Sequence, residues 1–441
     1  MEILSSYNLI IGASLIVVLS FFFNGISKKT NIPAVLMLIV LGILIKITLE
    51  FFIPEIPDFK GSLEILGTVG LIMIVLEAAL ELELKREKLW PIIKSMAVAL
   101  IGLVGSAYVA ALILYQFIPN MTMQSAWLYA TPLSILSSAI IIPSVGGLAE
   151  EKKEFHIYES TFSDIMGIMM FYFLTGKLNP VEDTGVSGFT LNLVLTIVIA
   201  LVASYAIILI FQKIKSQAKL FLLIAVLLLL YAIGKKMHLS SLIIILVFGL
   251  IVKNVNLFFP GKTKIFLESE RMQQIYHELH IVTLETAFVV RTFFFVIFGI
   301  TIVLSSLLSI NVAIVSLLII ASIYAIRFLV LMIFVGKDML PQLFIAPRGL
   351  ITVLLFYAIP SEAQIERFES GILLFVIIAT SLVMTWAMIK DKRKMGTLLD
   401  EIDEEITERN LTEDAIRASE AIAPTETEGE NPQTDIFENN R

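Results

Sequence analysis

A carboxylate and two hydroxyl groups lie close together in one apolar stretch of the chain. This stretch contains Glu159-Ser160-Thr161-Phe162-Ser163-Asp164-Ile165-Met166-Gly167. Successive residues of a helix turn by about 100°, so Ser160 and Ser163 share the face of Asp164, and Gly167 joins them there. Oxygen ligands of this kind suit a hard cation. The spacing therefore predicts that Asp164 binds a monovalent cation. A structural salt bridge of Asp164 is the alternative.

Glu159 points away from this face, because it lies about 140° from Asp164 on the same helix. It cannot easily share a cation with Asp164, and a buried arginine is the expected partner of a buried carboxylate. We predict that Arg327 is this partner. A second, weaker ion pair is predicted between Glu77 and Arg348.

The elements that must position these residues are apolar helices in lipid. The chain has 441 residues, of which 57% are hydrophobic and 16% are charged, and its mean hydropathy is +0.90. Soluble proteins average about 45–50% apolar and about 25% charged residues, so no water-soluble core could hold this much apolar surface. The chain has no cysteine, which excludes disulfides, thiolate metal sites and cysteine nucleophiles.

A helix needs roughly 20 apolar residues to cross the hydrocarbon core of a bilayer. By this criterion the chain is an all-α polytopic membrane protein with about thirteen transmembrane helices. The eighth and ninth are short and separated by Gly234-Lys235-Lys236, so the count is good to about one. The predicted spans are Tyr7–Ile26, Ile32–Phe52, Leu63–Leu84, Pro91–Tyr115, Ser125–Leu148, Phe155–Thr175, Leu191–Phe211, Leu220–Ile233, Leu239–Val252, Ile281–Leu304, Ile310–Val335, Pro341–Ile359 and Ser370–Ile389.

Five charged residues on five of these spans are expected near one layer at the middle of the bilayer. The helical rise of about 1.5 Å per residue places Glu77 and Arg348 about 10 Å from the cytosolic ends of their spans. Asp164 and Arg327 lie about 14 Å in, and Arg291 about 15 Å. Ionisable residues at this depth are costly and mark a pathway or a pair. Because arginine stays protonated, Arg291 is expected to act as a fixed counter-charge.

Two spans contain backbone breakers beside these charges. The fifth contains Ala130-Thr131-Pro132 and Pro143 around a polar run of Ser134, Ser137 and Ser138, and the twelfth contains Ala346-Pro347-Arg348-Gly349. A proline within a span frees carbonyls, which is tolerated where the backbone lines a cavity. Each interrupted span is the fifth of a set of six, with the seventh span as a linker. This pattern predicts two inverted six-helix repeats whose site lies where the breaks meet. Two ordinary proline kinks are the alternative.

Loop charges predict the orientation and the domain boundary. Twenty lysines and arginines fall in loops on the side of the membrane that holds the C-terminus, and five fall in loops on the opposite side. Because positive loop charges mark the cytoplasmic side, the N-terminus is expected outside and the C-terminus in the cytoplasm. From Asp400 to Arg441, fourteen acidic residues and three arginines give a net charge of −11, against +4 for the preceding chain. We predict a transmembrane domain at 1–390 and an acidic, partly disordered cytosolic tail at 391–441. The tail is expected to begin with an amphipathic helix built on Leu398, Leu399, Ile402 and Ile406.

Over roughly residues 7–390, the chain resembles the monovalent cation:proton antiporter family, which includes the sodium/proton exchangers. The motifs are short, but they occur in the family's order and spacing. They are Lys28-Lys29-Thr30-Asn31-Ile32-Pro33 with Gly42, Leu76-Glu77-Ala78-Ala79-Leu80-Glu81-Leu82-Glu83-Leu84, Glu159-Ser160 with Ser163-Asp164, Phe293-Phe294-Phe295 with Gly299, Arg327-Phe328-Leu329, and Arg348-Gly349-Leu350.

The resemblance implies a secondary antiporter that exchanges Na⁺, or K⁺ or Li⁺, for H⁺ across the cell inner (plasma) membrane, working as a homodimer. Asp164 is expected to bind either the cation or a proton, with Thr131, Ser160 and Ser163 as further oxygen groups of the site. Burial disfavours an ionised carboxylate, whereas a bound cation favours it, so the two ions compete. One carboxylate predicts one cation for one proton, and therefore electroneutral exchange.

Three positions depart from the family pattern. The fifth-span motif Thr-Asp-Pro reads Ala130-Thr131-Pro132 here, so its aspartate is missing. The residue before the key carboxylate, Asn or Asp in the family, is Ser163. Arg291 stands in the helix where electrogenic relatives carry a lysine.

Other functions were weighed against exchange. A cation channel or leak on the same fold, or a sensor that has lost transport, is the main alternative. An enzyme is not expected, because His277-Glu278-Leu279-His280 has histidines three apart and a zinc-protease motif needs four. We expect no cofactor and no nucleic-acid partner. Histidines such as His156 are expected to be hydrated at the headgroup layer, with pH sensing as the alternative.

Overall fold

The computed structural model describes residues 6–30, 32–52, 60–178, 185–214, 219–237, 241–259, 269–302, 306–307, 309–365 and 368–391. Within these ranges the regular structure is helical, without β-strands. The amphipathic helix predicted in the acidic tail lies outside the described residues.

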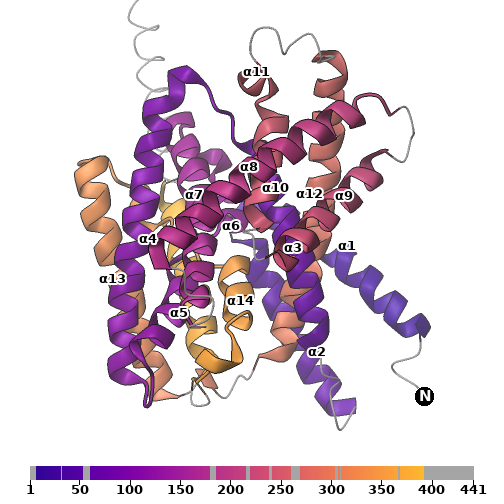
Figure 1. Ribbon diagram of the computed structural model, residues 1–441. Helices are drawn as coiled ribbons and strands as arrows, with labels where there is room; N and C mark the ends of the chain where they lie inside the picture. The colour runs from indigo at the N-terminus through magenta and orange to yellow at the C-terminus, as the bar shows by residue number, and fades with distance from the viewer. Residues whose placement is uncertain are drawn as a thin grey trace, which may run out of the picture. The chain divides into compact units, whose positions relative to one another are not determined.

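The helices follow one another along the chain as Figure 1 shows. Short 3₁₀ turns occur at Arg86–Lys88, Val145–Gly147, Gln342–Phe344 and Ser361–Ala363. The helices are α1 (Ser6–Thr30), α2 (Ala34–Phe52), α3 (Lys60–Glu81), α4 (Leu89–Phe117), α5 (Met123–Ser134), α6 (Ser138–Ser144), α7 (Glu150–Gly176), α8 (Gly185–Phe211), α9 (Lys219–Lys236), α10 (Ser241–Lys253), α11 (Val255–Phe258), α12 (Ser269–Thr301), α13 (Ile310–Phe334), α14 (Leu350–Tyr357) and a last helix at Gly371–Asp391.

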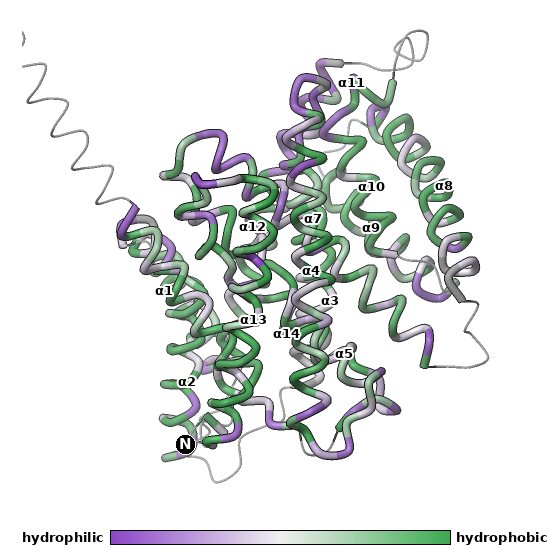
Figure 2. The backbone as a smooth tube through the Cα atoms, turned by 90° about the vertical axis from the view of Figure 1, so that its left-hand side faces the viewer, coloured by the Kyte–Doolittle hydropathy of each residue, from purple (hydrophilic) through white to green (hydrophobic). Residues whose placement is uncertain are grey.

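The predicted fold class is confirmed: the chain is an all-α, multi-pass membrane protein. Eight of the described helices are long and apolar enough to cross a membrane. Figure 2 shows hydrophobic residues along the helices, with hydrophilic residues gathered toward helix ends and connections. Each predicted span overlaps a helix or an interrupted helix among the described residues. The count of thirteen remains a prediction.

The fifth span is interrupted between α5 and α6, at residues 135–137. The interruption predicted in this span is confirmed, and it lies between the two prolines: Pro132 is inside α5 and Pro143 is inside α6. The helix opens within the serine-rich run, where side-chain hydroxyls compete for backbone hydrogen bonds. Ser134 shows this competition, because its hydroxyl donates to the Ala130 carbonyl at 2.9 Å.

The twelfth span is interrupted before α14. After the turn at Gln342–Phe344, residues 345–349 are not helical. Pro347 lacks an amide hydrogen, and the residue before a proline disfavours the α region. Here the proline signal in the sequence did mark the position of the interruption.

The most extensive helix packing falls into two groups. A core group contains α4, α5, α6, α7 and α13, and a flanking group contains α2, α3, α8, α9, α10 and α12. α14 contacts both groups, through α5 and α3. Figure 1 shows α4 and α13 on one side of the molecule and α2, α9 and α12 on the other. The first interruption and α7 therefore belong to the core group, and the second interruption borders on it.

Candidate cation site

Asp164 lies on α7 against the first interruption. Its side chain is buried, and Oδ2 accepts a hydrogen bond from the Ser138 amide at 3.2 Å, at the start of α6. Within the described part of the chain, Oδ1 has no hydrogen-bond partner. One carboxylate oxygen therefore holds the interruption in place, and the other is available to a cation or a proton.

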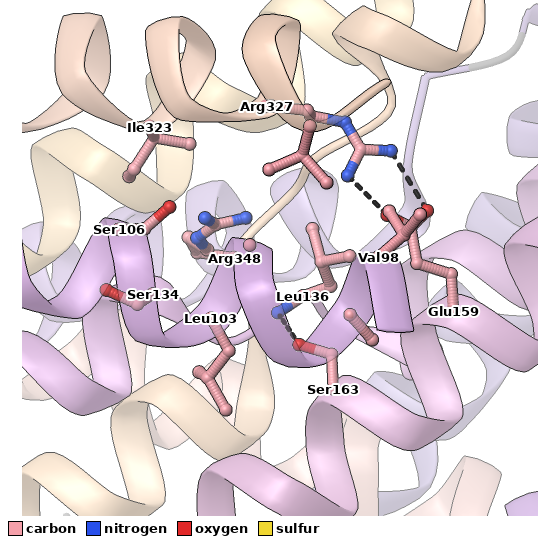
Figure 3. A pocket seen from close by; sticks show the side chains of 13 residues that line it. Val98, Leu103, Ser106, Ser134, Leu136, Glu159, Ser163, Ile323, Arg327 and Arg348 are labelled. Carbon is pink, nitrogen blue, oxygen red and sulfur yellow. Dashed lines mark hydrogen bonds and ion pairs between the residues drawn. The ribbon is translucent and has the colours of Figure 1, made fainter. Parts of the chain in front are cut away.

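Two further residues of the same α7 face hold the interruption. Ser163 Oγ accepts a hydrogen bond from the Leu136 amide at 3.0 Å (Figure 3). Gly167 provides room for Ile135, because a Cβ at position 167 would overlap the Ile135 side chain. The polar face predicted from the sequence thus contacts the unwound backbone, and the Ser163 hydroxyl satisfies a main-chain amide there.

Glu159 and Arg327 form a buried, bidentate ion pair. Arg327 Nη1 donates to Glu159 Oε1 at 2.7 Å and Nη2 to Oε2 at 3.0 Å (Figure 3). Arg327 also donates through Nε and Nη2 to the Gln342 carbonyl, at 3.1 and 2.9 Å. The structure therefore brings together these two predicted residues and ties them to the segment that leads into the second interruption.

The predicted pair between Glu77 and Arg348 is wrong. Glu77 on α3 contacts Arg291 on α12, with 3.3 Å between Oε1 and Nη2. Arg348 instead donates through Nε to the Leu133 carbonyl at 2.7 Å and through Nη1 to the Ala346 carbonyl at 2.9 Å. The predicted depth in the bilayer did not separate Arg348 from Arg291 as the partner of Glu77. Arg291 is the partner because α3, which carries Glu77, packs on α12. Arg348 instead pairs with carbonyls that the interrupted backbone leaves without a helical partner.

The two interruptions contact each other. The Ser137 amide of the first donates to the Pro347 carbonyl of the second at 3.0 Å. The Arg348 amide donates to Thr380 Oγ1 on the last helix at 3.2 Å. Main-chain groups that a continuous helix would satisfy internally thus find hydrogen-bond partners in the other interruption or in a neighbouring helix.

Thr131 and Ser160 direct their hydroxyl hydrogens to their own helices. Thr131 donates to the Trp127 carbonyl and Ser160 to the His156 carbonyl, each at 2.7 Å. Their oxygens retain lone pairs for a cation, but no hydrogen bond among the described residues joins either of them to Asp164. Their role as cation ligands remains a prediction.

A small cavity of about 20 Å³ lies next to the two interruptions. Asp164 does not line it. This volume is sufficient for about one water molecule, so the cavity is part of the packing around the ion pair and is too small to serve as a pathway. Its polar lining comprises Ser106, Ser134, Glu159, Ser163, Arg327 and Arg348 (Figure 3).

His156 is fully buried, which differs from the hydrated position expected from the sequence. Its Nδ1 lies 3.3 Å from Glu159 Oε2, one helical turn away on α7. Since α7 begins at Glu150, residue 156 already lies in the second turn and packs inside the core group.

Comparison with known proteins agrees with this geometry. The family profile described as "Sodium/hydrogen exchanger, transmembrane" matches residues 15–390. The chain belongs to this sodium/hydrogen exchanger family. A comparison with curated proteins gave no match.

Solved structures show that the exchanger fold is shared. The sodium proton antiporter MjNhaP1 from Methanocaldococcus jannaschii at pH 8 matches with a TM-score of 0.63 and 20% identity, over 87% of this chain and 99% of that one. An electron-microscopy structure of the same antiporter matches with a TM-score of 0.62 and 19% identity, over 90% and 97%. At this identity the likeness establishes the fold alone.

Sequence reasoning missed the main-chain part of this exchanger site. The Leu133 and Ala346 carbonyls and the Leu136 and Ser138 amides all take part in the hydrogen bonds around the two interruptions. Residue types carry no direct record of main-chain partners. The serine-rich run was the only signal, since it marks where a helix can open.

Proposed function

We propose that this exchanger-family protein carries out electroneutral exchange of one Na⁺ for one H⁺, with both ions competing for Asp164. The observation that carries the proposal is that Oδ1 of this carboxylate has no hydrogen-bond partner among the described residues. In contrast, Glu159 and Glu77, the other two buried carboxylates among the described residues, each face an arginine. An ionised carboxylate in an apolar site is costly unless a positive charge accompanies it. Either a cation or a proton must therefore bind to Asp164 before the site changes its access from one side of the membrane to the other.

Charge counting supports the electroneutral stoichiometry. Of the three buried carboxylates in the described residues, Glu159 is paired with Arg327 and Glu77 with Arg291, which leaves Asp164 as the site for one transported ion. Binding either Na⁺ or H⁺ adds one positive charge. Both loaded forms then carry the same charge, so the membrane potential favours neither.

Alternating access would be a movement of the core group against the flanking group. The extensive packing lies within each group, and the site residues on α7 travel with the two interruptions they contact. Thr131 and Ser160 are proposed as further cation ligands. We place the protein in the plasma membrane as a homodimer, with the N-terminus outside and the C-terminus in the cytoplasm.

The decisive variant is Asp164→Asn, which keeps the shape of the side chain and removes its charge. In proteoliposomes with an internal pH dye, a Na⁺ step should change the internal pH for the natural protein and leave it unchanged for the variant. Glu150→Gln, which removes an exposed carboxylate at the start of the same helix, should exchange normally. If the Asp164→Asn protein still moves protons on a Na⁺ step, the competition mechanism is wrong.

The alternative is a cation channel or leak. The same vesicles distinguish the two, because a channel carries Na⁺ down a voltage gradient without a fixed proton count. The identity of the cation is tested by replacing Na⁺ with K⁺ or Li⁺ in equal steps.

A further inference from the structure

One buried hydroxyl beside Asp164 has no role in the site described so far. Thr161 lies three residues before Asp164 on α7 and is fully buried. Its Oγ1 has no hydrogen-bond partner among the residues that the structure describes, and the same holds for Asp164 Oδ1. Residues three apart on a helix are neighbours, with Cβ atoms roughly 5–6 Å apart. Two unsatisfied oxygens thus lie on adjacent positions of one helix face.

The other hydroxyls of this region do not share this property. Ser160 and Thr131 donate to carbonyls four residues earlier, and Ser163 accepts from Leu136. Thr175, on the same helix as Thr161, donates to the Phe171 carbonyl at 2.9 Å. Six buried hydroxyls lack a partner in the described ranges, and only Thr161 belongs to the helix that carries Asp164; the others are on Ser95, Thr283, Ser316, Tyr324 and Ser381.

A buried hydroxyl without a partner costs about 1–3 kcal/mol. This cost is avoided if the hydroxyl finds its partner in the working site. A threonine hydroxyl holds one hydrogen and two lone pairs and rotates to suit its surroundings. It can donate to ionised Asp164 Oδ1, accept from protonated Asp164, or turn a lone pair to a bound cation.

We propose that Thr161 Oγ1 is a ligand of the transported monovalent cation. The proposal rests on the proposed function of Asp164 and adds a residue that helps set the affinity for the cation. It also supplies an oxygen to a site in which Thr131 stands where the family motif has an aspartate.

The test compares three variants in proteoliposomes by the Na⁺ dependence of exchange. Thr161→Val keeps the shape of the side chain and removes the hydroxyl, and should raise the KM for Na⁺ at least about tenfold, since a hydrogen bond to a charged group is lost. Thr161→Ser keeps the hydroxyl and should stay close to the natural protein. Thr175→Val removes a hydroxyl from the same helix and should leave the KM unchanged.

A binding measurement provides a readout that does not depend on transport. NaCl should raise the melting temperature of the detergent-solubilised natural protein and of Thr161→Ser, and should have a weaker effect on Thr161→Val. A KM within twofold of the natural value for Thr161→Val, or an equal effect of Thr175→Val, would overturn the assignment. Failure of the proposed function is a separate result, namely exchange by Asp164→Asn.

Discussion

The three carboxylates that are buried among the described residues differ in what their oxygens face. Both Glu159 oxygens accept from Arg327, and Glu77 faces Arg291 at 3.3 Å. Asp164 faces no arginine among the described residues: Oδ2 accepts from the Ser138 amide, and Oδ1 has no hydrogen-bond partner there. A carboxylate that is already neutralised by a fixed guanidinium gains little from a cation. At the scale of single residues, this difference supports the proposal that Asp164 binds the transported ions and that Glu159 has a structural role.

Loss of the buried arginine should be costly. Arg327→Met leaves Glu159 charged and unpaired in an apolar setting, which typically costs about 3–5 kcal/mol. We expect a clearly lower melting temperature in detergent and little protein in the membrane fraction. Lys153→Met breaks the exposed pair with Glu150, whose carboxylate is 72% exposed, and should cost less than about 1 kcal/mol. Equal melting temperatures for the two variants would contradict this ranking.

The residues of the site could be predicted from the sequence more fully than their contacts. Helical spacing separates Asp164 from Glu159, and a buried acid requires a buried base, so Arg327 could be named. The partner of Arg348 could not, because it is the Leu133 carbonyl, and every residue has a carbonyl. Thr161 was also passed over, since its significance comes from the hydrogen bond that it does not make.

At the scale of helices, the contact between α2 and α12 depends on two glycines. A Cβ added at Gly42 would overlap the Val296 carbonyl and lie 2.9 Å from the Gly299 Cα, and one at Gly299 would overlap the Ile39 carbonyl. The obstructing atoms are backbone, which cannot rotate away. α2 and α12 approach this closely because neither helix carries a side chain at the point of contact.

Gly42→Ala should therefore separate α2 from α12 and lower stability by about 1–3 kcal/mol, as overpacking does. Gly12 on α1 provides the matched control, because a Cβ there would meet nothing within 4 Å. Gly12→Ala should be neutral or stabilising by up to about 1 kcal/mol, from helix propensity. Thermal unfolding in the same detergent measures both, and a stable Gly42→Ala variant would argue against the close approach.

The interrupted helices show what an element-level pattern can and cannot provide. Pro347 marked the second interruption because proline restricts both its own backbone and that of Ala346. Pro132 and Pro143 flank the first and lie inside the helices on either side of it. A proline within a helix is accommodated where neighbouring groups take up the freed carbonyls, so the opening at residues 135–137 depended on contacts with α7 that the sequence does not reveal.

At the scale of the whole molecule, the balance of buried charge predicts the electrical behaviour of exchange. With Na⁺ or H⁺ on Asp164, the midplane charge is the same, so a membrane potential should not drive or slow the cycle. Vesicles clamped by a potassium gradient and valinomycin should show equal Na⁺/H⁺ exchange rates at zero and at inside-negative potential. A rate that changes severalfold with potential would indicate a different stoichiometry, and this assay requires that K⁺ is shown not to be a substrate.

The proximity of Gly349 to Ser137 has a genetic consequence. Residues 137 and 349 belong to opposite halves of the chain, and a Cβ at position 349 would overlap the Ser137 hydroxyl and approach the end of the Ile140 side chain. Gly349→Ala should therefore abolish growth on high sodium in a host that lacks its own exchangers. A second-site change, Ser137→Gly, should restore that growth, whereas Ser134→Gly should not. Suppressors of damage in one half of this protein should thus be sought in the other half.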